Sequence, residues 1–200
     1  MSREGGFVVL DGPSGVGKST LARLLAERLN SAGHRCVVTR EPSTGPIGVV
    51  ARDGTHAFHG LTLACLVAAD RYHHLATEIR PALAAGYMVI CDRYLPSSLV
   101  LQRLDGVPTE YVWSLHVHAD RPDLTIILAG DPQLCQRRAA RRGTYSRFHH
   151  GIAGEIEAYR DVASVLALAG YPTITYDIGH DPPEQVADAL SPRILAFLAC

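Results

Sequence analysis

Residues 6–20 read GFVVLDGPSGVGKST, and the order of patterns in this segment indicates the class of fold. Residues 6–10 are almost entirely apolar, which predicts a buried strand. Gly12 to Ser19 then matches the pattern GxxxxGK[ST], and the leucine spacing that begins at Lys18 predicts a helix. Glycines in such a loop let backbone N–H groups close around phosphate oxygens, and the helix N-terminus adds partial positive charge. Strand, loop and helix in this order predict a phosphate-binding loop.

The residues of this loop have distinct expected roles toward a nucleoside triphosphate. Lys18 reaches the β- and γ-phosphates as a compact point charge, and the Ser19 hydroxyl is placed to ligate Mg²⁺. Lys18 is also the only lysine among 19 basic residues, so a chain that otherwise uses arginine keeps an ammonium here. A guanine-specific GTPase switch is excluded, because its base-reading motif needs a second lysine. The residues assigned to nucleotide binding are Gly12, Pro13, Ser14, Gly15, Val16, Gly17, Lys18, Ser19 and Thr20.

Strand-like and helical patterns alternate along the rest of the chain. Strands are expected over 6–10, 35–39, 87–91, 123–129 and 173–176, and helices over 18–32, 61–85, 152–169 and 181–199, with a short helix and a loop in 45–60. Apolar strands that alternate with helices indicate a parallel sheet covered on both faces. We therefore expect one domain over 1–200 with a three-layer α/β fold, a five-stranded parallel sheet and a small arginine-rich lid over about 137–151.

Composition narrows the class of protein. Hydrophobic residues make up 47% and charged residues 20%, which is enough apolar content for a full hydrophobic core. The net charge of −1 argues against a generally basic surface that would bind nucleic acid or anionic lipid. No apolar run reaches the roughly 18–20 residues of a membrane span, and the first residues are too weakly apolar for a signal peptide. Five scattered cysteines without CxxC argue against a disulfide framework or a zinc ribbon. We expect a cytoplasmic protein with no nucleic-acid or membrane partner.

Further motifs adjoin the predicted strands, where open α/β sheets bind ligands. They are TREP (39–42), GPIG (45–48), AADR (68–71), CDRY (91–94) and RPDLTIIL (121–128). Together with the phosphate loop, and in this order, they resemble bacterial thymidylate kinases over nearly the whole chain, whereas the loop alone resembles guanylate kinases equally well. The resemblance implies the P-loop NTPase fold and a nucleoside monophosphate kinase. Such an enzyme uses Mg²⁺ to transfer the γ-phosphoryl group of ATP to dTMP or a related or modified pyrimidine nucleotide, and is usually a homodimer.

The resemblance implies catalytic roles for Lys18, Asp92 and Arg93. Asp92 binds Mg²⁺ through water beside Ser19, and Arg93 holds the acceptor phosphate by bidentate contact. A plainer alternative for Asp92 is a strand-end or helix-capping carboxylate. The sequence therefore has candidate residues for binding the donor phosphates, the Mg²⁺ ion and the acceptor phosphate.

The same resemblance implies an acceptor site. Arg40 lies near the acceptor phosphate, Glu41 orients Arg40, Arg93 or the sugar, and Arg71 hydrogen-bonds the base. The alternatives are a surface ion pair between Arg40 and Glu41, and an exposed helical Arg71 paired with Asp70 or Glu78. The whole expected set is Asp11, Ser14, Arg40, Glu41, Val67, Arg71, Arg93, Ser98, Leu101 and Gln102.

Arginines in the expected lid supply charge that the phosphate loop lacks. An arginine over the γ-phosphoryl oxygens stabilises the charge that spreads there during transfer. Family members without an arginine in the loop supply it from the lid, where Arg142 and Arg147 are the best catalytic matches and Arg138 is assigned to ATP. The alternative is a nucleic-acid patch or a solvated basic helix. Only one aromatic residue, Tyr145, lies within the arginine-rich residues 137–147, which gives stacking on nucleic-acid bases little support.

Three positions depart from the family pattern. Ser14 stands where an acidic residue usually contacts the sugar, Val67 where Phe stacks on the base, and Leu101 where Tyr or Phe walls the sugar. These substitutions predict altered recognition of the base and the sugar. The alternative is ordinary divergence, with dTMP still the substrate. Two other functions stay open: a kinase of a non-nucleotide small molecule, and a nucleotide-binding regulatory protein without turnover. Paired histidines, including 73–74 and 116/118, are expected on the surface or in the lid.

Overall fold

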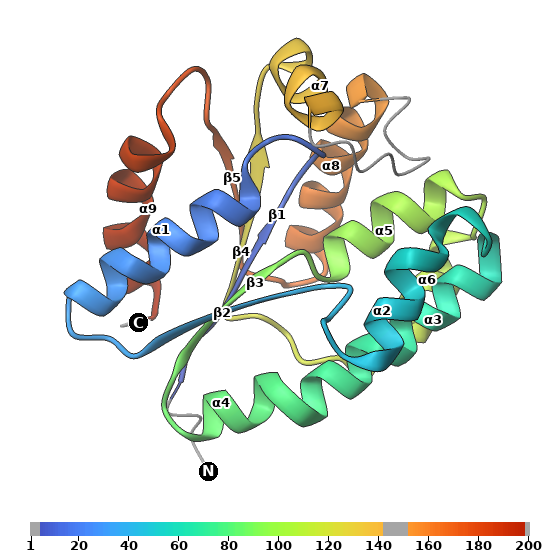
Figure 1. Ribbon diagram of the computed structural model, residues 1–200, viewed down its shortest axis with the longest axis horizontal. Coiled ribbons are helices and arrows are strands. Elements are labelled where there is room, and N and C mark those ends of the chain that lie inside the picture. Colours follow the sequence, from blue (N-terminus) through green and yellow to red (C-terminus); the bar gives the residue numbers. More distant parts are fainter. Residues whose placement is uncertain (1–4, 142–151, 199–200) are drawn as a thin grey trace.

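The centre of the molecule is a sheet of five parallel strands in the order β2-β3-β1-β4-β5 (Figure 1). The computed structural model describes residues 5–141 and 152–198. The strands are β1 (Phe7–Asp11), β2 (Cys36–Arg40), β3 (Met88–Asp92), β4 (Leu124–Ala129) and β5 (Thr173–Asp177). All five predicted strands are present, and each of their bounds lies within one residue of the prediction. The predicted fold class is confirmed.

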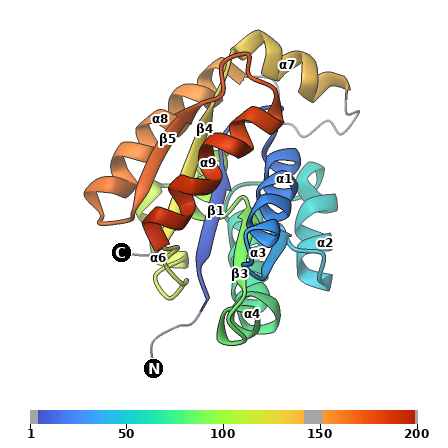
Figure 2. The same ribbon diagram turned by 90° about the vertical axis from the view of Figure 1, so that its left-hand side faces the viewer.

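Helices cover both faces of this sheet (Figure 2). The first face carries α1 (Lys18–Ser31) and α9 (Pro183–Leu198), and the second carries α3 (Gly60–His74), α4 (Arg80–Ala84), α5 (Leu95–Leu104) and α8 (Ile152–Leu168). Successive β1 residues alternate between the two cores, because strand side chains point to opposite faces: Val8 and Leu10 join the first, Phe7 and Val9 the second. In the part of the chain described, no helix is long and apolar enough to cross a membrane.

The long helix predicted over 61–85 is divided by a π turn at Leu75–Ile79, between α3 and α4. Pro81 follows in the first turn of α4. Proline lacks an N–H and its ring crowds the carbonyl one turn earlier, so a locally widened turn accommodates it. The single helix predicted over 61–85 is therefore interrupted just before Pro81.

Three other regions complete the fold. The segment 45–60 forms α2 (Pro46–Asp53), the predicted short helix, and the 3₁₀ helix η1 (Gly54–His56) where a loop was expected. Sequence patterns gave no element for α5 or for α6 (Thr109–Leu115); α5 is buried on almost all sides and lacks an amphipathic period. The predicted lid begins inside a helix, because residues 137–141 end α7 (Pro132–Arg141). Residues 142–151 of that lid lie outside the described part of the chain.

The chain leaves neighbouring strands β1 and β3 toward opposite faces, into α1 and α5 respectively. A parallel sheet opens a crevice at such a switch point, beyond the carboxyl ends of the strands. The phosphate loop follows β1 at this crevice, and Asp92 ends β3 beside it. The fold therefore brings together the two motifs that the sequence separates by more than 70 residues.

Candidate active site

The phosphate loop joins β1 to α1 and holds Lys18 across its own backbone. Lys18 Nζ donates to the carbonyl oxygens of Gly12 at 2.7 Å and Pro13 at 2.8 Å. Burial and the nearby Arg93 lower the pKa of Lys18 to about 8, so the ammonium persists at neutral pH. Gly15 is required because its φ is +79° and a Cβ there would overlap the carbonyl of Cys135 on α7. The loop is thus preorganised around one buried cation.

Ser19 and Asp92 form the candidate magnesium site. Ser19 Oγ donates to Asp92 Oδ2 at 2.5 Å, and Asp92 Oδ1 is buried with no hydrogen-bond partner among the described atoms. Asp92 does not cap α5, whose N-cap residue is Tyr94 without a side-chain cap, so the capping alternative is wrong. Mg²⁺ binds through one or two carboxylates together with water and phosphate oxygens, and this hydroxyl and carboxylate fit that requirement.

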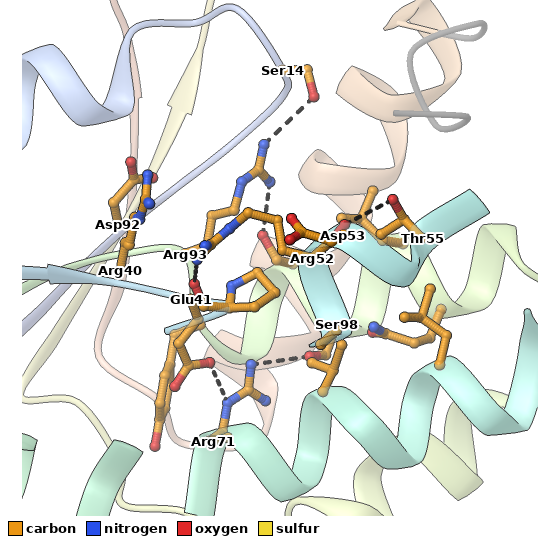
Figure 3. A pocket seen from close by; sticks show the side chains of 18 of the residues that line it. Ser14, Arg40, Glu41, Arg52, Asp53, Thr55, Arg71, Asp92, Arg93 and Ser98 are labelled. Carbon is orange, nitrogen blue, oxygen red and sulfur yellow. Dashed lines mark hydrogen bonds and ion pairs between the residues drawn. The ribbon is translucent and has the colours of Figure 1, made fainter. Parts of the chain in front are cut away.

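Arg93 is held by groups from three parts of the fold. Its Nη1 donates to Ser97 Oγ on α5 at 3.0 Å and to Tyr159 Oη on α8 at 3.2 Å. Nη2 donates to Ser14 Oγ in the loop at 3.5 Å (Figure 3). The backbone of Arg93 has φ 75°, a strained conformation for a residue with a side chain. Strain of this kind persists where surrounding contacts impose it, and here they fix the guanidinium at the cavity wall.

Asp11 corrects one expectation, because it does not line the acceptor cavity. The carboxylate is fully buried below the loop. It accepts hydrogen bonds from Ser97 Oγ at 2.7 Å, from Tyr159 Oη at 2.9 Å and from the Tyr94 amide at 3.0 Å. These donors occupy its oxygens, so Asp11 supports the residues that hold Arg93 and has no oxygen facing an acceptor.

A cavity of about 710 Å³ lies beside the loop, within the size range of small-molecule sites. Nine of the ten predicted acceptor residues line it: Ser14, Arg40, Glu41, Val67, Arg71, Arg93, Ser98, Leu101 and Gln102. Ser19 and Asp92 line it too, so the candidate metal site opens into the same space. Residues far apart in the sequence thus form one site, as the motifs predicted.

Arg71 is the most deeply buried cation of this cavity wall. Only 1% of its surface is exposed, and its guanidinium lies 4.5 Å above the Tyr94 ring. Nε donates to Glu41 Oε2 at 2.7 Å and Nη2 to Ser98 Oγ at 3.0 Å, while buried Nη1 has no partner among the described atoms (Figure 3). The guanidinium therefore keeps N–H groups that no described atom accepts, at a side chain that lines the cavity.

These contacts settle two alternatives. Arg71 is not an exposed arginine paired with Asp70 or Glu78. Glu41 is buried and pairs with Arg71, not with Arg40 or Arg93, so the surface ion pair between Arg40 and Glu41 is wrong too. The expected contact of Glu41 with the sugar stays a prediction. Arg40, which is exposed, still lines the cavity.

Asp70 ties the TREP segment to α3. Its carboxylate accepts from the Ser43 amide and from Ser43 Oγ, both at 2.6 Å, and both side chains are buried. A buried carboxylate with two donors is a strong local anchor. The AADR motif therefore supplies Arg71 to the cavity and Asp70 to the loop that carries Glu41.

Glu155 is a carboxylate at the phosphate loop that the sequence analysis missed. It is fully buried on α8, and its Oε1 accepts from the Ser14 amide at 3.1 Å and lies 3.4 Å from Ser14 Oγ. Burial raises the pKa of Glu155, and Arg93 and Lys18 oppose that rise. The resemblance implies an acid at the position of Ser14, and in this fold an acid from 141 residues away contacts that serine. No local pattern could have signalled this pairing.

The base end of the cavity is walled by aliphatic side chains and polar residues of α2 and η1. Val67 and Leu101 line it, as do Asp53, Thr55 and His56, which the ambiguous pattern of 45–60 did not single out. Tyr94 is the only Phe, Tyr or Trp among the described lining residues. Its ring packs edge-on against Phe7 beneath Arg71, so it is not free to replace a stacked Phe.

A smaller cavity of about 190 Å³ lies on the other side of the loop. Val16, Gly17 and Thr20 line it together with Asp181 and Arg138, which was predicted to bind ATP. The two predicted catalytic arginines of the lid, Arg142 and Arg147, lie outside the described residues.

The histidine prediction is wrong for two positions. His74 and His116 are buried rather than on the surface. Burial, with Arg71 nearby, lowers the pKa of His116 to about 2, so this imidazole is neutral. Among the residues that the structure describes, no cluster of three or more histidine, cysteine or acidic side chains could hold a metal.

Comparison with known proteins places this geometry in a family. The family model described as thymidylate kinase matches residues 10–189. A probable thymidylate kinase of Pyrobaculum aerophilum is 36% identical over 199 residues, which cover 96% of this chain and 98% of that protein. A thymidylate kinase of Xanthomonas euvesicatoria pv. vesicatoria is 34% identical over 200 residues, with 98% and 87% covered. With both motifs and cavities in place and a match over nearly its full length, the chain belongs to the thymidylate kinase family.

Proposed function

We propose that this nucleoside monophosphate kinase transfers the γ-phosphoryl group of ATP to dTMP or a closely related pyrimidine nucleotide. The observation that carries the proposal is the pair of cavities on either side of one phosphate loop. Ser19 borders the larger cavity and the adjacent Thr20 the smaller one, with buried Lys18 beside them. A donor in the smaller cavity and an acceptor in the larger one would meet at the loop, as direct transfer requires.

The residues divide the work of transfer between them. Lys18 places its charge on the donor phosphates, and the loop amides surround them. Arg93 presents its guanidinium to the acceptor phosphate, and the groups around it prevent it from turning away. Arg71 offers its free Nη1 to the base. No nucleophilic side chain is needed, since the acceptor phosphate oxygen itself attacks the γ-phosphorus.

Ser19 and Asp92 would hold Mg²⁺ with the donor phosphates. The support is the short contact between Ser19 Oγ and Asp92 Oδ2, together with the buried, unpartnered Asp92 Oδ1. A Mg²⁺ ion held there would supply positive charge that neutralises the donor phosphates. Asp92 contributes by keeping a carboxylate at the end of β3, where the loop opens.

The competing functions are less well supported by this cavity. A non-nucleotide acceptor gives no reason for Arg93 and Arg40 to line one space with Arg71. A protein without turnover gives no reason to retain Lys18 and the pair of Ser19 and Asp92 in this arrangement. Measuring ADP release with a panel of nucleoside monophosphates tests the proposal, and no release with any of them would contradict it.

Three further expectations belong to the same proposal. Arg142 and Arg147 supply positive charge to the transferring group, since the phosphate loop has no arginine. The chain acts in the cytoplasm, where both substrates occur. It forms a homodimer, which is supported by exposed apolar side chains on the adjoining helices α2, α3 and α6: Val49, Val50, Leu61 and Tyr111. Light scattering after gel filtration tests the dimer.

Val67→Phe should strengthen binding of dTMP. The ring would restore a stacking face in the cavity, and such a face contributes enough for a roughly 10-fold lower KM. Val67→Leu is the control, because it adds volume without an aromatic face. The measurement is kcat/KM for dTMP, dUMP, UMP, CMP and a 5-hydroxymethyl pyrimidine monophosphate in competition.

The wild-type chain should discriminate weakly among these nucleotides, since Val67 and Leu101 leave room around the base and sugar. The larger 5-substituent should be tolerated, whereas every acceptor should need its 5′-phosphate for Arg93. A clear wild-type preference for dTMP over all the others would show that the substitutions are ordinary divergence.

A further inference from the structure

His74 lies behind the acceptor cavity, on α3 and against β2. Its side chain is 1% exposed and does not line the cavity. Nε2 lies 2.8 Å from Thr39 Oγ1 and 3.5 Å from Glu78 Oε2, and Nδ1 lies 3.3 Å from Glu41 Oε1. The imidazole therefore connects the end of β2 with the carboxylate that lies next to the cavity.

Glu41 is held on both of its oxygens. Oε1 faces His74 and Oε2 accepts from Arg71 Nε at 2.7 Å. Arg71 Nη2 is fixed by Ser98, and Arg71 itself lines the cavity. A carboxylate with a single partner can rotate about its side-chain torsions, whereas two partners fix its plane and so the plane of the paired guanidinium.

We propose that His74 is a positioning residue for acceptor recognition: by holding Glu41, it fixes the Arg71 guanidinium at the cavity wall that would face the acceptor base. The inference rests on the proposed function, because it takes the cavity to be the nucleotide acceptor site. His74 itself touches no substrate. Its effect passes through Glu41 and is expected in acceptor binding, not in ATP binding.

The contact to Glu41 can hold in both protonation states of the ring. Thr39 has a hydroxyl that can donate to Nε2 of a neutral imidazole or accept from Nε2–H of the cation, so Nδ1 keeps its proton toward Glu41. Burial opposes the charge of His74, yet Glu41, Glu78 and Asp70 raise its pKa. Positioning is therefore retained across neutral pH.

Two amide variants separate positioning from packing. In His74→Asn the amide nitrogen takes the place of Nδ1 and can still donate to Glu41, whereas in His74→Gln the amide lies near the place of Nε2. We expect His74→Gln to raise the acceptor KM about 10-fold, the scale of a lost hydrogen bond to a charged group, and His74→Asn to stay within roughly 3-fold of wild type. The KM for ATP should not change in either.

The neighbouring His73→Gln is the matched control, because it places the same substitution on the same helix outside the cavity lining. Equal increases in acceptor KM for His74→Asn and His74→Gln, or a parallel change in the KM for ATP, would mean that His74 only fills space. If His74→Gln does not fold, Thr39→Val tests the same series of contacts, because it removes the hydroxyl that holds the imidazole at Nε2. An unchanged acceptor KM there overturns the inference.

Failure of the proposed function gives a different result. In that case the wild-type protein phosphorylates no nucleoside monophosphate in the panel. If only the inference fails, wild-type turnover is normal and the two His74 variants do not differ in acceptor KM. The two outcomes are therefore distinguished in one set of assays.

Discussion

Lys18→Ala should reduce kcat by roughly 10²- to 10³-fold or more, the scale seen when one preorganised donor to developing charge is removed. Lys18 Nζ now bridges the carbonyls of Gly12 and Pro13, and no second lysine exists in the chain to replace it. The fold should remain, because the lost side chain is a buried cation within the loop and belongs to neither hydrophobic core. Steady-state kinetics and thermal unfolding of the variant measure both effects.

Lys18→Arg should fail as well, since a planar guanidinium does not fit the space of a compact ammonium between two carbonyls. Arg28→Ala on the same helix is the control, because Arg28 pairs with Asp188 at the surface and such pairs contribute little to stability. Near-normal turnover of Lys18→Ala would contradict the assignment of this loop to phosphoryl transfer.

The fold could be predicted from the sequence because its signals are local. Strands buried on both faces are continuously apolar, so β1, β3 and β4 are visible in the sequence without any knowledge of their neighbours. Helix α5 shows the limit of this reasoning. It is packed between other helices on nearly all sides, so its sequence lacks the 3.6-residue period that identifies surface helices.

The candidate site likewise contains residues that sequence motifs identify and residues that only the fold reveals. Lys18, Ser19 and Asp92 stand in motifs whose spacing predicts their roles, and the structure brings them together. Glu155 and His74 act across the fold, on residues far away in the sequence, and an acid or a histidine on a helix gives no hint of its partner. Arrangements of this kind depend on the packing of helices against the sheet.

Asp11 shows why a motif assigns a position more safely than a role. It adjoins the phosphate loop, and the resemblance placed it in the acceptor site. In the fold its carboxylate points beneath the loop toward the start of α5, where backbone amides and the hydroxyls of Ser97 and Tyr159 surround it. Whether a strand-end side chain points above or below the sheet depends on register.

Arg93→Lys should lower kcat/KM for the acceptor about 10²-fold or more, the scale of losing a buried, hydrogen-bonded charge contact. Lysine keeps the charge but cannot donate at once to Ser97 and Tyr159 and still present two N–H groups to a phosphate. The KM for ATP should change little, because Arg93 does not line the smaller cavity. Kinetics with each substrate varied in turn separate the two parameters.

Arg40→Lys is the matched control for this substitution. Arg40 lines the same cavity but is exposed, so screening by solvent weakens its contact and the expected loss in kcat/KM is smaller. Both variants should unfold at similar temperatures, since each keeps its positive charge. Equal losses for the two variants would mean that the cavity needs only net positive charge near the acceptor phosphate. The larger loss at Arg93 alone would identify the fixed guanidinium, held from α5 and α8, as the phosphate-recognising group.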